Sequence, residues 1–165
     1  MSKSIIATVL ALFLLTAEES NAQVNFGVKF GSASYTEIEL GFQTGSNLNI
    51  GGVYIFSSSN GPGYYGASVR KAFEPFYLSG IWDRGIRPYL MGTVGYMSAF
   101  KTIEKGGVAG CVGGGLEFNL DSKGSITIPA EIAVGKMPSQ NIISDAGKVT
   151  SAFYFSVGTR FYLYR

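Results

Sequence analysis

Seven charged side chains fall at positions that alternate with apolar residues along the sequence. Side chains of a β-strand point to its two faces in turn, so each of these charges shares a strand face with other polar or small residues. Charges of both signs on one face can pair with each other or line a polar path. The candidate residues are Lys29, Glu37, Glu39, Arg70, Glu117, Glu131 and Arg160.

Catalysis is the first chemistry to consider for such a set. Glu37 and Glu39 lie two apart on one face and resemble a glycosidase carboxylate pair, but nothing else in the sequence indicates a sugar site. The chain contains no His, which excludes His-based triads, His–metal sites and imidazole acid–base catalysis. Residues 113–115 are three glycines within a strand pattern rather than a phosphate loop before a helix. We therefore expect no catalytic residue, no metal site and no cofactor.

The segment from Ala152 to Arg165 shows the alternation most clearly. One parity is apolar, and the other carries Ser156, Gly158 and Arg160. This pattern favours a membrane β-strand with one face toward lipid, although a half-buried strand of a soluble β-sandwich would alternate in the same way.

Similar alternation along the rest of the chain predicts seven more strands, and helical periodicity is weak throughout. The sequence therefore predicts an all-β fold, an eight-stranded antiparallel up-and-down transmembrane β-barrel. The expected strands are 24–32, 35–44, 47–57, 64–72, 88–100, 108–120, 125–136 and the closing strand from residue 152.

Two places are harder to interpret. Residues 73–86 could form a long turn, a short helix or an extra pair of strands. Pro129 lies within an otherwise clean strand but has no N–H to donate, and a closed barrel has no free edge to accommodate it. We expect a bulge or a lost ladder bond there.

The N-terminal segment has the pattern of a secretory signal peptide. Lys3 precedes an apolar run from Ile5 to Ala17, and Ser20-Asn21-Ala22 places small residues where signal peptidase cleaves. We expect residues 1–22 to be removed after Ala22, which leaves residues 23–165 as a single barrel domain. The apolar run is short for a membrane-spanning helix.

Composition agrees with an exported barrel. The chain has 23 Gly, 12 Phe and 10 Tyr, with 15% charged residues. After loss of Lys3, Glu18 and Glu19 with the signal, 12 basic and 9 acidic residues remain, so the net charge is only +3 and nucleic acid is not an expected partner. A single cysteine allows no intramolecular disulfide.

The chain resembles the small eight-stranded outer-membrane barrels of the OmpX, OmpA-transmembrane and opacity-like type. The resemblance is carried by a C-terminal assembly signal of the pattern polar, any, Gly, any, any, apolar, any, apolar, and by Arg87 to Gly92 followed by Gly95-Tyr96. The chain departs from the family by ending in Arg165 rather than an aromatic residue. The residues that match the fixed positions of the signal are Ser156, Gly158, Phe161 and Leu163.

This resemblance implies the outer membrane of a Gram-negative bacterium as the location. It also implies outer-membrane lipid and the barrel-assembly machinery as partners, and we expect a monomer. The seven charges would then share a narrow lumen, where we expect a plug rather than a gated polar path, because eight strands leave little room beyond side chains.

Three functions remain open from the sequence. The leading hypothesis is a non-enzymatic outer-membrane barrel with a structural or surface-interaction role. The second is a narrow channel or small-ligand conduit on the same fold. The third is a secreted soluble β-barrel that binds an apolar ligand.

Overall fold

The computed structural model describes residues 23–32, 35–44, 47–57, 63–98, 106–136 and 152–163. Nine strands lie in these ranges, and the described residues contain no helix that is long and apolar enough to cross a bilayer. The strands are β1 Gln23–Gly31, β2 Tyr35–Gln43, β3 Leu48–Ser57, β4 Tyr64–Ala72, β5 Phe76–Leu78, β6 Trp82–Met97, β7 Gly107–Asn119, β8 Ile126–Lys136 and β9 Ala152–Leu163.

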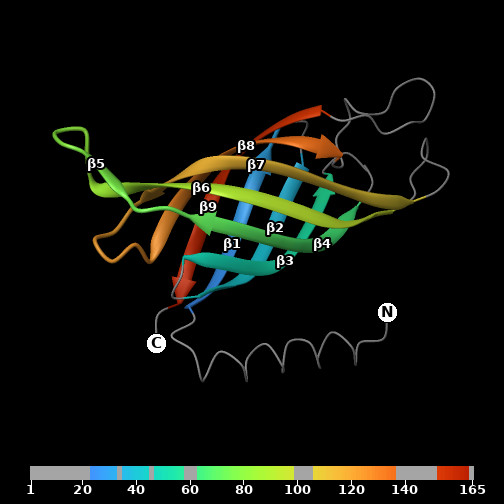
Figure 1. Ribbon diagram of the computed structural model, residues 1–165, viewed down its shortest axis with the longest axis horizontal. Coiled ribbons are helices and arrows are strands. Elements are labelled where there is room, and N and C mark those ends of the chain that lie inside the picture. Colours follow the sequence, from blue (N-terminus) through green and yellow to red (C-terminus); the bar gives the residue numbers. More distant parts are fainter. Residues whose placement is uncertain are drawn as a thin grey trace.

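Eight of these strands form a closed antiparallel barrel, as the alternation predicts (Figure 1). Each strand pairs with its neighbour in sequence, β9 returns to pair with β1, and β4 pairs with β6. Closure leaves no long unpaired edge in the barrel wall, so backbone N–H and C=O groups are bonded within the sheet.

The barrel has two ends that differ in their connections. Gln23 and Leu163 lie at one end, together with Thr44, Asn47 and the turn at 120–125. We call this the terminal end. At the opposite end, which we call the loop end, β1, β3, β6 and β8 finish and the following strands begin.

Residues 73–86 form an extra strand pair, one of the three alternatives left open by the sequence. β5 pairs only with β6, at Phe76–Ile86 and Leu78–Trp82, with an irregular register between the two positions. The strand expected to begin near Pro88 therefore begins at Trp82 instead. Its additional residues extend past the barrel wall because β5 supplies a partner for them there.

Pro129 does not produce a bulge. β8 pairs with β9 at Ile126 and Thr127, skips Ile128 and Pro129, and resumes at Ala130 in the same register. On its other side, Pro129 stays paired with Glu117 of β7. Pairing at Pro129 is therefore lost only on the side that faces β9. Of the two expected outcomes, a bulge or a lost ladder bond, the structure shows the lost bond.

The strands are staggered around the barrel. We follow residue pairs from strand to strand around the barrel, starting at Gln23 on β1, and arrive at Tyr154 on β9. Tyr154 lies two residues before Ser156, and Ser156 pairs with Gly31 at the far end of β1. The path therefore returns to the position of β1 about ten residues from its start. In an eight-stranded barrel, a stagger of this size goes with strands tilted by about 40° to the axis. The interior of such a barrel is just wide enough for side chains. The residues on this path are Gln23, Gln43, Asn49, Arg70, Met91, Gly113, Ala133 and Tyr154.

The two faces of the wall have opposite polarity to those of a water-soluble protein. Large apolar side chains cover the outer face, as at Phe30, Ile132 and Phe155, which are 61%, 58% and 56% exposed. Charged side chains point inward, where Lys29 and Arg160 are 2% and 1% exposed. This is the alternation expected from the sequence.

Candidate functional site: the barrel lumen

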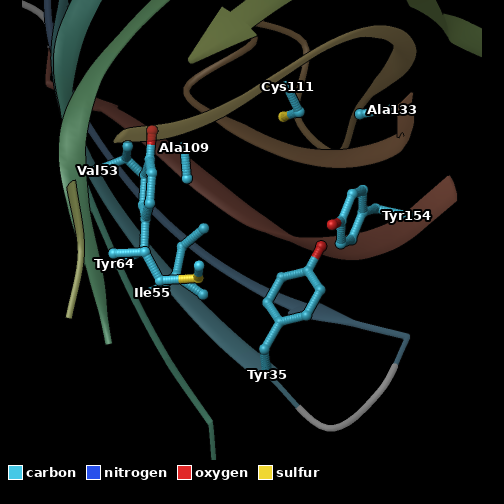
Figure 2. Packing of buried hydrophobic residues seen from close by; sticks show 9 residues of the cluster. Tyr35, Val53, Ile55, Tyr64, Ala109, Cys111, Ala133 and Tyr154 are labelled. Carbon is cyan, nitrogen blue, oxygen red and sulfur yellow. The ribbon is translucent and has the colours of Figure 1, made fainter. Parts of the chain in front are cut away.

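The lumen contains two layers of side chains. The layer toward the loop end is mainly apolar, and we call it the apolar cluster (Figure 2). Tyr35 and Tyr154 meet there edge to face, with ring centroids 6.5 Å apart. The cluster comprises Tyr35, Val53, Ile55, Tyr64, Met97, Ala109, Cys111, Ala133 and Tyr154.

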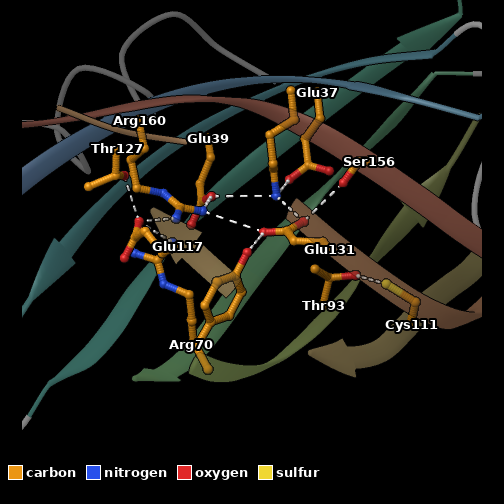
Figure 3. A network of polar contacts seen from close by, with 12 residues as sticks. Glu37, Glu39, Arg70, Thr93, Cys111, Glu117, Thr127, Glu131, Ser156 and Arg160 are labelled. Carbon is orange, nitrogen blue, oxygen red and sulfur yellow. Dashed lines mark hydrogen bonds and ion pairs between the residues drawn. The ribbon is translucent and has the colours of Figure 1, made fainter. Parts of the chain in front are cut away.

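The second layer begins at mid-barrel and continues toward the terminal end. It contains all seven charged residues expected in the lumen, each 5% exposed or less (Figure 3). We call these seven residues, with Tyr89 and Tyr162, the ion cluster. Thr93 and Cys111 lie where the layers meet, with Thr93 Oγ1 3.4 Å from Cys111 Sγ.

Lys29 is the centre of one half of the ion cluster. Its Nζ lies 2.6 Å from Glu37 Oε1 and 2.7 Å from Glu131 Oε2. A third carboxylate, that of Glu39, lies 3.7 Å away. Ser156 also donates to Glu131 Oε2 at 3.2 Å. The ammonium of β1 thus joins carboxylates from β2 and, across the lumen, β8.

Arg160 is the centre of the other half. Its Nη1 donates to Glu117 Oε1 at 2.6 Å, and its Nη2 donates to Glu39 Oε2 at 2.8 Å. The same Nη2 lies 3.6 Å from Glu131 Oε1. A guanidinium offers several donors in a fixed plane, which suits a residue that bridges separate carboxylates.

Two tyrosines complete the ion cluster. The Tyr89 hydroxyl donates to Glu131 Oε1 at 2.7 Å, and its ring lies 5.3 Å from the Arg70 guanidinium and 5.9 Å from that of Arg160. The Tyr162 hydroxyl donates to Glu117 at 2.9 Å and accepts from Arg70 Nη2 at 3.0 Å. Each tyrosine therefore contacts an arginine and a glutamate at once: Tyr89 does so through its ring and its hydroxyl, and Tyr162 through its hydroxyl.

Hydroxyl donors compensate for the excess of negative charge. The cluster has four carboxylates and three cations. Glu117 accepts from Thr127 as well as from Tyr162, and Glu131 accepts from Ser156 as well as from Tyr89. A buried carboxylate is tolerated when its oxygens are paired and hydrogen-bonded. The carboxylates of Glu117 and Glu131 are therefore well satisfied, whereas Arg70 Nη1 and Arg160 Nε are buried without a hydrogen-bond partner among the described residues.

Glycines in the wall make room for these long side chains. A Cβ at Gly115 would lie 2.8 Å from the Tyr89 hydroxyl and 2.4 Å from the carbonyl of Ala130. A Cβ at Gly158 would lie 2.7 Å from Lys29 Cγ and 2.1 Å from the carbonyl of Val28. Any larger residue at either position would displace a member of the ion cluster or the neighbouring strand.

Little space remains between the two layers. A cavity of about 10 Å³ lies between Glu37, Met91 and Tyr154, and a second of about 10 Å³ lies between Ser68, Arg70 and Thr93. Each has room for about one water molecule. Within the ranges that the structure describes, no group of three His, Cys, Asp or Glu side chains is arranged to hold a metal ion.

Sequence reasoning identified the charges but missed the tyrosines. Tyr162 has the same parity as Arg160, so its inward direction could have been inferred from alternation. Tyr89 precedes two glycines that obscure the phase of β6. The residues of the expected assembly signal divide between the faces: Ser156 and Gly158 point inward, whereas Phe161 and Leu163 are 41% and 64% exposed outside.

Comparisons with known proteins support the fold. No protein-family model matches the chain, and neither does any curated protein. Among solved structures, the N-terminal β-barrel domain of OprF from Pseudomonas aeruginosa matches with a TM-score of 0.58 and 13% identity, over 87% of this chain and 98% of that one. A de novo designed transmembrane β-barrel matches with a TM-score of 0.45 and 11% identity, over 86% of this chain and 94% of the design.

Proposed function

We propose that this protein is a non-enzymatic integral β-barrel of the outer membrane of a Gram-negative bacterium, with a filled lumen and a structural or surface-interaction role. The observation that carries this proposal is the reversed polarity of the wall. Leu90, Val94 and Phe153 are 59%, 60% and 78% exposed, whereas Glu117 and Arg160 are each 1% exposed. Water would be a poor solvent for such an outer face, and lipid a suitable one.

The lumen favours the structural role over a conduit. An ion that entered from the terminal end would meet carboxylates already paired with Lys29, Arg70 and Arg160. It would then meet the apolar cluster, which offers few groups to replace its water of hydration. The cavities between the layers are too small for a hydrated ion or for the apolar ligand of a soluble carrier.

Export and assembly follow from the same proposal. Residues 1–22 lie outside the described residues, and we propose that they are a signal peptide cleaved after Ala22. We further propose that the barrel-assembly machinery recognises the end of β9 through Ser156, Gly158, Phe161 and Leu163. Phe161 and Leu163 are open to a partner on the outer face of β9, which suits this role. The inserted protein is proposed to be a monomer.

Cell fractionation tests the proposed function. The protein should sediment with outer membranes, resist extraction by carbonate, and need detergent to remain monodisperse after purification. A soluble periplasmic protein that is monodisperse without detergent would contradict the proposal. N-terminal sequencing of the mature protein provides a separate test of cleavage after Ala22.

A further inference from the structure

The connection between β4 and the barrel portion of β6 is a projecting hairpin. It comprises residues 73–85, and we call it the rim hairpin. It extends past the terminal end of the barrel, where Figure 1 shows β5 near the extreme of the molecule. At its tip the N–H of Ile81 donates to the carbonyl of Leu78 at 2.9 Å, and Gly80 has a φ of 78°. A turn that only joined two neighbouring strands would need far fewer residues.

The rim hairpin exposes apolar side chains on both of its faces. All three residues of β5 are exposed, and Ile81 at the tip is 80% exposed. The turn at 120–125, at the same end of the barrel, consists of Leu, Asp, Ser, Lys, Gly and Ser instead. A cluster of exposed apolar side chains on one hairpin indicates an interaction surface. Its members are Phe73, Phe76, Tyr77, Leu78 and Ile81.

Contacts with β7 hold the rim hairpin in place. The rings of Trp82 and Phe118 meet edge to face with centroids 5.9 Å apart. Asn119 Nδ2 donates to the carbonyl of Arg84 at 2.9 Å, and Arg84 donates to the carbonyl of Leu120. The apolar surface is therefore presented by a fixed element, and its ordering cost is met before any partner binds.

We propose that the rim hairpin lies in the lipid head-group layer at the terminal end and anchors the barrel there; this inference rests on the proposed membrane location. On β6 the outward-facing Leu90, 59% exposed, is followed toward the hairpin by Ile86, which pairs with both Phe76 and Phe118 and is only 2% exposed. Trp82 lies four residues beyond Ile86. At about 3.3 Å per residue and a tilt of about 40°, this distance is about 10 Å along the axis.

The composition of the hairpin agrees with a membrane interface, and the proposal places the edge of the hydrocarbon between Ile86 and Trp82. Head-group layers extend about 5–8 Å beyond the hydrocarbon on each side. Aromatic residues are enriched in that layer, and basic residues beside it attract anionic lipids. The rim hairpin combines Phe, Tyr and Trp with the exposed Arg84, and Lys71 is exposed on the adjoining end of β4. The exposed Glu74 and Asp83 balance these two basic residues, so the aromatic side chains carry the argument and a net positive charge does not.

Tryptophan fluorescence can test this placement because Trp82 is the only tryptophan in the chain. With Trp82→Phe as background, single tryptophans are introduced by Tyr77→Trp in the hairpin, by Phe155→Trp in the outer apolar face and by Ser122→Trp in the polar turn at the same end. Each full-length protein is folded into phosphatidylcholine–phosphatidylglycerol vesicles whose acyl chains are brominated either near the head group or near the chain end. Heat-modifiable migration on gels confirms folding, and Ile81→Trp replaces Tyr77→Trp if the latter does not fold.

The hairpin tryptophan should have blue-shifted emission and be quenched more strongly by the shallow bromines. The Phe155→Trp protein should be quenched more strongly by the deep bromines, and the Ser122→Trp protein should emit as in water. Water-like, unquenched emission from the hairpin with normal quenching at position 155 would overturn the anchor and leave the hairpin available to a soluble protein. Absence of quenching at both positions would overturn the membrane location as well.

Discussion

Arg160 on β9 joins Glu39 on β2 to Glu117 on β7 through the two terminal nitrogens of its guanidinium. Neither carboxylate belongs to the strands beside β9, so the contact crosses the lumen instead of running along the wall. Arg160 and Glu117 are each 1% exposed. A pair so fully desolvated depends on its geometry, since an unpaired charge in the same place would be costly.

Replacing this arginine should therefore destabilise the barrel strongly. Arg160→Ala should lower the free energy of unfolding by about 3–5 kcal/mol, because it leaves two buried carboxylates without their shared partner. Arg160→Lys should recover part of the loss by restoring the charge but not the two-pronged contact. Urea unfolding of the protein in lipid vesicles gives the measurement. Lys136→Ala, at an exposed site, serves as the control and should change stability by no more than about 0.5 kcal/mol.

The charges of this cluster could be predicted from the sequence, but their partners could not. Alternation has a period of two and reports only the face of each side chain. Which charges meet depends on the stagger of about ten residues around the barrel, and each strand's pattern is compatible with other even shifts of register. Val53 and Ile55 interrupted the polar parity of β3 in the sequence. In the structure they form part of the apolar cluster, so the lumen contains an apolar layer beside the seven expected charges.

The sequence left three alternatives open for the segment that forms the rim hairpin, one of them the extra strand pair that the structure shows, for a different reason. Residues 73–86 mix Pro, Gly and bulky apolar residues, so that no period of two or of 3.6 is sustained. β5 has only three residues, and its partner strand is irregular opposite it. Pairing within such a short segment is decided by tertiary contacts, among them those of Trp82 and Asn119 with neighbouring elements.

The hydroxyl of Tyr89 should contribute measurably to stability. Tyr89→Phe removes the donor to Glu131 while keeping the ring between the two arginines, and should cost about 1.5–3 kcal/mol, the range for hydrogen bonds to charged groups. Tyr96→Phe on the outer face of the same strand is the matched control. Equal unfolding midpoints for the two variants would mean that Glu131 is adequately stabilised by Lys29 and Ser156 alone.

The cost of a charge on the outer face should depend on depth. Ile132 and Ile126 lie on the same face of β8, with Ile132 near mid-barrel and Ile126 at the terminal end. Ile132→Arg should destabilise the inserted barrel by about 2–4 kcal/mol, and Ile126→Arg by no more than about 1 kcal/mol. Unfolding titrations in vesicles of the same lipid compare the two. Equal costs would contradict a lipid-facing wall.

The end of β9 should contribute to insertion through the proposed assembly signal, in addition to the contact of its apolar side chains with lipid. Phe161→Ser with Leu163→Ser should lower the amount of protein in the outer membrane, because these residues occupy the apolar positions of the proposed assembly signal. Phe153→Ser with Phe155→Ser removes two comparably exposed side chains from the same strand but leaves the signal intact. Immunoblots of membrane fractions should show the greater loss for the first pair. An equal loss for both pairs would assign the effect to lipid contact alone.

Little or no stable conductance is expected from the wild-type barrel. The ion cluster neutralises the charges that would attract a permeating ion, and the apolar cluster closes the lumen toward the loop end. Arg160→Ala should remain non-conducting although it is destabilised, because removing one cation leaves Tyr64, Ile55 and Met97 in place. Planar-bilayer recording compares both proteins at equal insertion, verified by heat-modifiable migration. Large, steady single-channel currents from the wild type would favour a conduit, and currents from Arg160→Ala alone would mean that the ion cluster is the sole barrier.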